Sequence, residues 1–243
     1  MLRIGVDVGG TNTDGVLIDV TRLHEPSRGV LAHYKAPTTT DVSKGIEEAV
    51  REVLRLASVS PTEVASVSIG TTAFINAVLE ADARRLAKVA VIRLSSVFTK
   101  QCPPFIDFPK PLRILTEGHV GYVDGGFEID GREIRPINEA QILEQCAIVK
   151  EKGLKNVVLT GIFSSLDNDG KQEIAAKAII ERELGPSVNV VASREVGQVG
   201  LLERENASIL NASILTFAQR TIRGFQNAMR HPRTHLSPLP HPK

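Results

Sequence analysis

The first 35 residues contain three strand-like segments, and the connections between them are too short to hold a helix. In residues 2–8, Leu, Ile and Val alternate with Arg, Gly and Asp, which is the period-two pattern of a strand with two unlike faces. Residues 15–19 and 29–35 are also strand-like. Because strands joined directly by turns run antiparallel, the chain is predicted to begin with three antiparallel strands.

Helical and strand-like patterns alternate after these three strands. Helices are predicted over residues 41–57, 71–83, 138–153, 167–185 and about 206–229, with Asp41 as the N-cap of the first. Further strands are predicted over residues 64–69, 89–92, 157–163 and 188–191. This order indicates an α/β fold with a mixed sheet.

Residues 95–136 interrupt the alternation. They contain two proline clusters, and glycine-rich pieces at 121–126 and 130–131 suggest short hairpins. We interpret 95–136 as an irregular insertion within an N-terminal domain of residues 1–192. Residues 193–230 are interpreted as the truncated start of a following region, and the Pro- and His-rich tail at 231–243 is predicted to be disordered.

Charge and composition exclude several classes of protein. The 243 residues carry 29 basic and 28 acidic side chains, so no broad field is expected to attract nucleic acid or anionic lipid. No stretch approaches the roughly 18 consecutive apolar residues of a membrane span. The strand-like pattern that starts at residue 2 leads us to expect no export leader, and two cysteines are too few for a disulfide framework. We therefore expect a cytoplasmic protein that binds neither nucleic acid nor membranes.

The turn between the first two strands is the most informative segment, and it reads DVGGTNTD at residues 7–14. Glycines let a backbone take positive φ and approach an anion closely, and successive N–H groups of such a turn bind phosphate oxygens. Thr11 and Thr13 can add hydroxyl donors. Asp7 beside an anion requires a shared cation such as hydrated Mg²⁺. The simpler alternative is a Gly-Gly hairpin with an incidental aspartate.

This turn resembles the first phosphate loop of the actin/hexokinase/Hsp70 superfamily. Two further blocks narrow the resemblance to the hydantoinase A/5-oxoprolinase family, namely GTTAFINAVLE at 70–80 and GLLER at 200–204 followed by ILNA at 209–212. The resemblance covers about residues 3–225 and implies an actin-like (ribonuclease H-like) ATPase lobe followed by an incomplete second lobe. The chain departs from the family pattern at Asn12, Gly15, 95–99, Glu205 and Asn206.

The family resemblance implies roles for individual residues. Four residues of the first turn would bind the phosphates of ATP: Gly9, Gly10, Thr11 and Thr13. Asp7 and Asp14 are the candidate catalytic residues; Asp7 would hold Mg²⁺ through water, and Asp14 would orient the loop or a substrate group. Three residues would add contacts from a strand-to-helix turn whose free N–H groups favour an anion: Thr71, Thr72 and Asn76. The alternative for that turn is a hydroxyl cap with the asparagine packed inside.

The charged pair Glu203 and Arg204 in the block at 200–204 has a simpler interpretation. Charged neighbours at a helix entry are commonly a solvated ion pair that contributes little to stability. We therefore assign this pair no function from the sequence.

The resemblance also implies an activity, the ATP-dependent opening of a cyclic amide such as 5-oxoproline or a hydantoin. Transfer of the γ-phosphoryl group to the amide oxygen would activate the carbonyl toward water, while the protein positions the groups and neutralises charge. The expected partners are a nucleotide and a small cyclic-amide substrate, with self-association or a partner subunit left open. Because the family's second phosphate loop is missing from these 243 residues, we expect the chain alone to be inactive.

Two alternatives stay open on the sequence. One is a sugar kinase of the same superfamily, whose opening motif is similar to the first turn. The other is a non-catalytic fragment that binds nucleotide or pairs with another subunit.

Overall fold

The computed structural model describes residues 1–37, 42–167 and 169–230. The chain divides into two compact units: unit 1 comprises Met1–Asn76 with Ala218–Lys243, and unit 2 comprises Ala77–Phe217. The predicted boundary between residues 192 and 193 divides the sequence into family regions and stays a prediction. The predicted helix cap at Asp41 and the predicted disorder of 231–243 lie outside the described residues.

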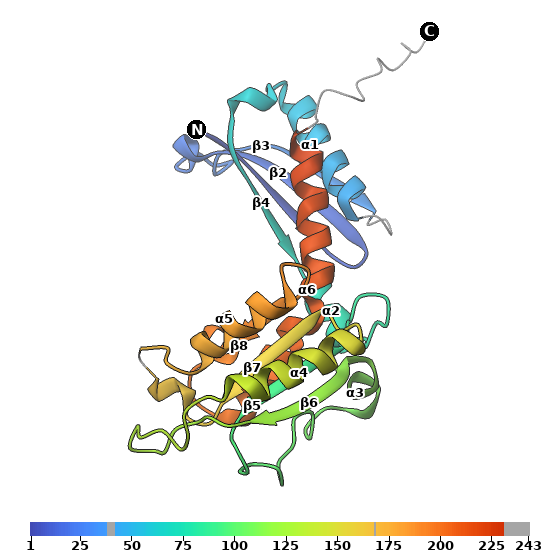
Figure 1. The fold of residues 1–243 in the computed structure, drawn as a ribbon. Coiled ribbons are helices and arrows are strands. Elements are labelled where there is room, and N and C mark those ends of the chain that lie inside the picture. The colour runs from blue at the N-terminus through green and yellow to red at the C-terminus, as the bar shows by residue number, and fades with distance from the viewer. Residues whose placement is uncertain (38–41, 168, 231–243) are drawn as a thin grey trace. The chain divides into compact units, whose positions relative to one another are not determined.

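Unit 1 is built on a four-stranded mixed sheet with the order β3-β2-β1-β4 (Figure 1). β1 (Leu2–Val8), β2 (Asn12–Asp19) and β3 (Val30–Pro37) are antiparallel neighbours, as predicted. β4 (Val64–Thr71) runs parallel to β1, so both strands end at the same edge of the sheet. The predicted α/β class with a mixed sheet is confirmed.

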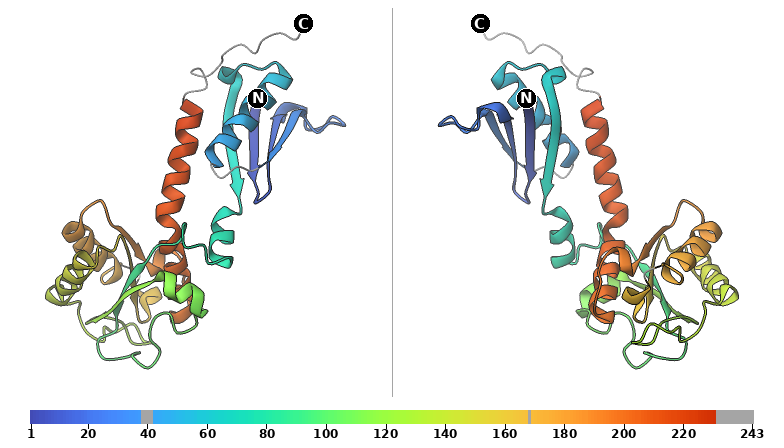
Figure 2. Two further views of the ribbon diagram at one scale, coloured as in Figure 1. Left: turned by 90° about the vertical axis from the view of Figure 1, so that its right-hand side faces the viewer. Right: turned by 90° about the vertical axis from the view of Figure 1, so that its left-hand side faces the viewer.

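One face of this sheet is closed by α1 (Val42–Ala57), and Figure 2 shows the helix lying along the strands. Its buried side chains repeat at helical spacing and pack on alternate residues of the strands: Ile46, Ala49, Val50, Val53 and Leu54 against Ile4, Val6, Val8 and Leu17. The intervening residues Arg3, Gly5 and Asp7 point to the opposite face, where Arg3 and Asp7 are exposed. We call this the open face of the unit 1 sheet.

Unit 2 contains a parallel sheet with the order β6-β5-β7-β8. Its strands are β5 (Val89–Leu94), β6 (Glu117–Val123), β7 (Asn156–Gly161) and β8 (Asn189–Ala192). All residues of β5 and β7 are buried, as the apolar run at 89–92 predicts for a strand covered on both faces.

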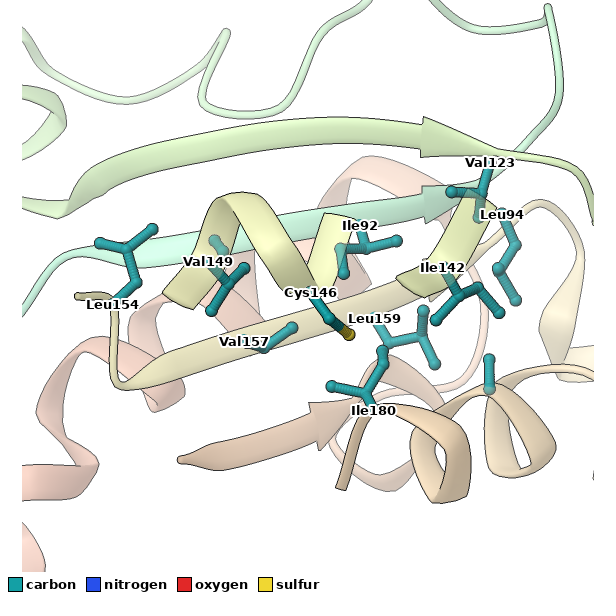
Figure 3. Packing of buried hydrophobic residues seen from close by; sticks show 12 residues of the cluster. Ile92, Leu94, Val123, Ile142, Cys146, Val149, Leu154, Val157, Leu159 and Ile180 are labelled. Atoms are coloured by element: carbon teal, nitrogen blue, oxygen red, sulfur yellow. The ribbon is translucent and has the colours of Figure 1, made fainter. Parts of the chain in front are cut away.

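Helices cover both faces of the unit 2 sheet. α4 (Glu139–Glu151) and α5 (Glu173–Leu184) pack on one face, where Figure 3 shows their side chains meeting those of β5 and β7. The other face packs against α6 (Leu201–Arg230) through Ile209 and Ala212. Among the helices that the structure describes, we find none long and apolar enough to cross a membrane.

The prediction that 95–136 is irregular is wrong for its middle part. α3 (Lys110–Thr116) and β6 lie there, and β6 pairs with β5 along its length. Gly118 and Gly121, the latter expected in a hairpin, are strand residues that make room for neighbours: a Cβ on Gly118 would lie 2.9 Å from Leu154 Cδ2. Glycine in a strand often marks such close approach, which local turn rules do not detect.

Three predicted helix boundaries also move. α2 (Ala73–Leu79) is shorter than the predicted 71–83, and Ala81 just beyond it has a positive φ of 46°. α5 begins at Glu173 because Asp167 lies outside the helix, where its carboxylate accepts from the N–H groups of residues 171 and 172 at 2.8 and 2.9 Å. α6 begins five residues earlier than predicted, directly after Gly200 at φ 88°.

The two cysteines are expected to react at very different rates. Cys102 is exposed, whereas Cys146 is buried in the α4 interface, where burial raises the pKa of its thiol to about 11. Because the thiolate is the reactive form, Ellman's reagent should modify one thiol per native chain and the second only in denaturant. Rapid modification of both thiols in the native protein would contradict this packing.

Candidate functional site

The turn between β1 and β2 is tight and its tip is exposed. Gly9 N–H donates to Asn12 O at 2.9 Å. Neither Gly9 nor Gly10 adopts a positive φ, contrary to the expectation from the sequence. Close approach explains the first glycine, because a Cβ at Gly9 would lie 3.2 Å from Asn12 O. Gly10 and Thr11 are exposed, so the backbone at the tip is accessible to a ligand.

Asp7 and Asp14 lie directly opposite each other across β1 and β2, on the open face. Lys35 of β3 is the next residue in this row, and its Nζ lies 3.3 Å from Asp14 Oδ1. On the other side, Gly70 of β4 pairs with Asp7, and a Cβ there would lie 3.5 Å from Asp7 Oδ1. Within residues 1–37, 42–167 and 169–230, no side chain forms an ion pair or hydrogen bond with the Asp7 carboxylate.

The two threonines of the turn differ in exposure. Thr11 is exposed at the tip, but Thr13 is fully buried. Thr13 pairs with Val8, whose side chain faces α1, and a Cβ on Gly45 of α1 would lie 3.2 Å from Thr13 Oγ1. The structure therefore places the Thr13 hydroxyl against the helix rather than on the open face with Asp7.

The block at residues 70–80 lies beside the turn at residues 7–14, because β1 and β4 are parallel neighbours. Thr71 pairs with Val8, and its hydroxyl donates to Val8 O at 3.1 Å while accepting from Ala73 N–H at 3.1 Å. The hydroxyl part of the alternative considered for this turn is therefore present, but Asn76 is only half-buried and not packed inside. Thr71 thus ties the end of β1 to the start of α2.

Asn76, in the block at 70–80, lies next to the glycine turn at 7–14. Its backbone N–H donates to Thr72 O at 2.9 Å, and its Nδ2 donates to Thr72 Oγ1 at 3.4 Å. A Cβ on Gly10 would lie 4.0 Å from Asn76 Nδ2, so residues 66 positions apart are neighbours at this edge. The structure gathers Asp7, Gly10 and Asn76 at one end of the sheet.

The donor atoms of this site fit a hydrated Mg²⁺ ion. The ion prefers oxygen ligands and is commonly held by one or two carboxylates together with substrate phosphates and water. Asp7 offers an exposed carboxylate without a protein partner among the described residues, opposite a second carboxylate on the same face. Lys35 was not predicted as part of this row, although the register of three antiparallel strands could have placed it there.

The interpretation of Glu203 and Arg204 as a solvated pair is wrong for the arginine. Glu203 is exposed, but Arg204 is buried and donates to Ser193 Oγ, Gly161 O and Gln198 O, each at 2.8 Å. Burial lowers the pKa of Arg204. Its side chain therefore joins the ends of β7 and β8 to α6.

Glu205 forms a fully buried ion pair with Arg93 of β5. Arg93 Nε donates to Glu205 Oε1 at 2.9 Å, and Nη2 donates to Oε2. Burial raises the pKa of Glu205, an effect that the hydrogen bonds from Arg93 oppose. This pair was not predicted from the sequence, although an arginine inside the apolar run at 89–94 indicates a buried acidic partner.

Comparison with known proteins shows which sequences and folds resemble this chain. The model of the hydantoinase/oxoprolinase N-terminal region matches residues 3–184, which confirms the resemblance found in the sequence. An uncharacterised protein, MJ0964 of Methanocaldococcus jannaschii, is 24% identical over 94% of this chain and 33% of its own length. The caprolactamase subunit alpha of Pseudomonas jessenii is 27% identical over 86% of this chain and 31% of its own length.

Two solved structures share the fold. The ATP-dependent caprolactamase of P. jessenii aligns with a TM-score of 0.69 and 22% identity, over 95% of this chain and 34% of that one. A nucleotide-free acetone carboxylase aligns with a TM-score of 0.69 and 18% identity over the same shares. The chain therefore spans about a third of the length of the proteins it matches.

Proposed function

The chain belongs to the hydantoinase/oxoprolinase family, and on that premise we propose that unit 1 binds the phosphates of Mg-ATP for an enzyme that opens cyclic amides. The observation that carries this proposal is the Asp7 carboxylate. It is exposed and unpartnered among the described residues, and it lies beside an accessible glycine turn and opposite Asp14. A carboxylate in that place suits a cation shared with phosphate.

Each residue of the site would have a defined task. The backbone N–H groups at Gly10 and Thr11, at the exposed tip, would donate to phosphate oxygens. Asp7 and Asp14 would hold Mg²⁺ directly or through water, and the ion would neutralise charge on the phosphates. Thr72 and Asn76, which follow β4, would donate side-chain hydrogen bonds to the phosphates. Thr71 would hold the turn between β4 and α2 in place.

The substrate class rests on the family and on one relative. An unstrained amide carbonyl is a poor electrophile, and phosphorylation of its oxygen would make it reactive toward water. The P. jessenii relative is named a caprolactamase, which supports a cyclic amide here. Gly10, Thr11 and Thr72 are exposed, so phosphates bound at this turn alone would stay in contact with water. We therefore expect no steady ATP hydrolysis from these 243 residues by themselves.

Asp7→Asn should weaken the binding of Mg-ATP about tenfold or more, because it removes the charge without changing the shape of the side chain. Isothermal titration of Mg-ATP and Mg-ADP into the wild-type chain and the variant measures this directly. Glu47→Gln is the matched control, since it removes one negative charge from α1, which packs on the closed face.

The result depends on two comparisons. Tight binding by the wild type and by Glu47→Gln, with loss in Asp7→Asn, supports the proposal. Equal affinity in Asp7→Asn and wild type, or no binding by the wild-type chain, would overturn it.

A further inference from the structure

A row of charged side chains crosses the open face of the unit 1 sheet at the edge where the nucleotide is proposed to bind. The register aligns Lys35 with Asp14, Asp14 with Asp7, and Asp7 with Gly70. Side chains opposite each other on neighbouring antiparallel strands are about 5 Å apart at their Cβ atoms. The row therefore holds one ammonium group and two carboxylates within contact range.

The two carboxylates repel each other, since like charges directly opposite in a sheet are destabilising. Lys35 relieves this repulsion from one side, with its Nζ 3.3 Å from Asp14 Oδ1. No such partner exists for Asp7 within the described ranges, and the row keeps a net charge of −1 centred on that residue. A divalent cation is therefore attracted first to Asp7, because the carboxylate of Asp14 is already paired with Lys35.

The lysine contact is easily exchanged. The side chains of Lys35 and Asp14 are 62% and 49% exposed, and exposed ion pairs of this kind contribute little to stability. Folding therefore does not depend on it. Lys35 lies near the end of the sheet that carries the glycine turn. It pairs with Asp14, which is one residue from Thr13, and Thr13 forms the last β1–β2 pair before the turn.

We propose that Lys35 is a phosphate-binding residue of the nucleotide site, which pairs with Asp14 before nucleotide binds and turns to a phosphate oxygen once both carboxylates share Mg²⁺. This inference rests on the proposed function of unit 1. It implies that the ligand carries a polyphosphate chain long enough to contact the glycine turn and the Lys35 ammonium group at the same time. It also predicts that Lys35 affects the metal alone and the metal–nucleotide complex in opposite directions.

Lys35→Gln should weaken the binding of Mg-ATP about tenfold, because a charge-assisted hydrogen bond to phosphate is lost. The same variant should bind Mn²⁺ alone more tightly than the wild type, because Asp14 is then free of its competitor. Titration calorimetry measures the first affinity, and electron paramagnetic resonance of free Mn²⁺ measures the second. Lys35→Arg keeps the charge and should restore both values to within a few-fold.

Lys44→Gln is the control, since it removes the same charge from an exposed position on α1 of the same unit. A variant that merely disturbed the sheet would weaken both ligands together, and that outcome would overturn the role of Lys35. So would Mg-ATP binding in Lys35→Gln equal to that in Lys44→Gln, while the proposed function would stand. Failure of the wild-type chain to bind Mg-ATP would remove the proposed function and this inference with it.

Discussion

Replacing Glu205 by alanine should lower the free energy of unfolding of unit 2 by about 3–5 kcal/mol. Glu205 and Arg93 are both fully buried, so the variant leaves a guanidinium group in the interior without its carboxylate. The carbonyl oxygens of Thr99 and Cys102 still accept from Arg93 Nη1, but they carry no full charge to balance it. Breaking one partner of a buried pair is costly for this reason.

The two tyrosines allow each unit to be followed by itself. The chain has no tryptophan, Tyr34 lies in unit 1, and Tyr122 lies in unit 2. Urea denaturation in a Tyr34→Phe background, followed by tyrosine fluorescence, therefore reports unit 2. Glu203→Ala, which removes an exposed carboxylate two positions earlier, is the control and should change stability by less than about 0.5 kcal/mol.

A double variant tests the charge argument. Arg93→Met with Glu205→Leu removes both charges and should recover most of the stability lost in Glu205→Ala. If Glu205→Ala were as mild as Glu203→Ala, the buried pair would not stabilise the contact between β5 and α6.

Gly29→Ala should destabilise unit 1 by about 3 kcal/mol or more, because two unfavourable effects coincide at this position. Gly29 has a positive φ of 75°, and a Cβ there would lie 2.2 Å from the backbone oxygen of Asp19. The same two residues are joined by the hydrogen bond from Asp19 N–H to Gly29 O at 2.8 Å. The connection between β2 and β3 must therefore shift to admit a methyl group.

Gly131→Ala separates the two effects. Gly131 also has a positive φ, of 82°, but a Cβ there would have no atom within 4 Å. This variant should cost only the conformational term, about 1–2 kcal/mol. Urea denaturation in a Tyr122→Phe background reports Gly29→Ala in unit 1, and the Tyr34→Phe background reports Gly131→Ala in unit 2. Equal losses in the two variants would mean that the contact with Asp19 is unimportant.

Short-range patterns in the sequence predict most of the fold. The alternation in residues 2–8 predicts both the strand β1 and its two unlike faces, and the helical stripe on α1 predicts its buried side. The same local reasoning fails for β6, because Gly121 was predicted to lie in a hairpin. In the structure Gly121 is a strand residue that makes room for the side chain of Gln145. Neighbours distant in the sequence decide such positions.

The candidate site divides in the same way. The turn at residues 7–14 and the block at 70–80 are visible as motifs, and the structure brings them together through the pairing of β1 with β4. The burial of Thr13 against α1 was not predictable from the motif, because the direction of its side chain follows from its pairing with Val8. Lys35 enters the site only when β3 is aligned against β2.

What the sequence by itself determined is therefore the type of most elements, though not of α3 and β6, and the chemistry available at their ends, because periodicity and turn residues act over a few positions. Only the tertiary structure decided which polar groups face solvent and which face a partner. Arg93 and Glu205 are charged residues 112 positions apart that become a single buried pair, and Asp7 is a carboxylate left open beside a glycine turn. The physical reason is that desolvation and charge pairing depend on distance in space, which strand register and helix packing set.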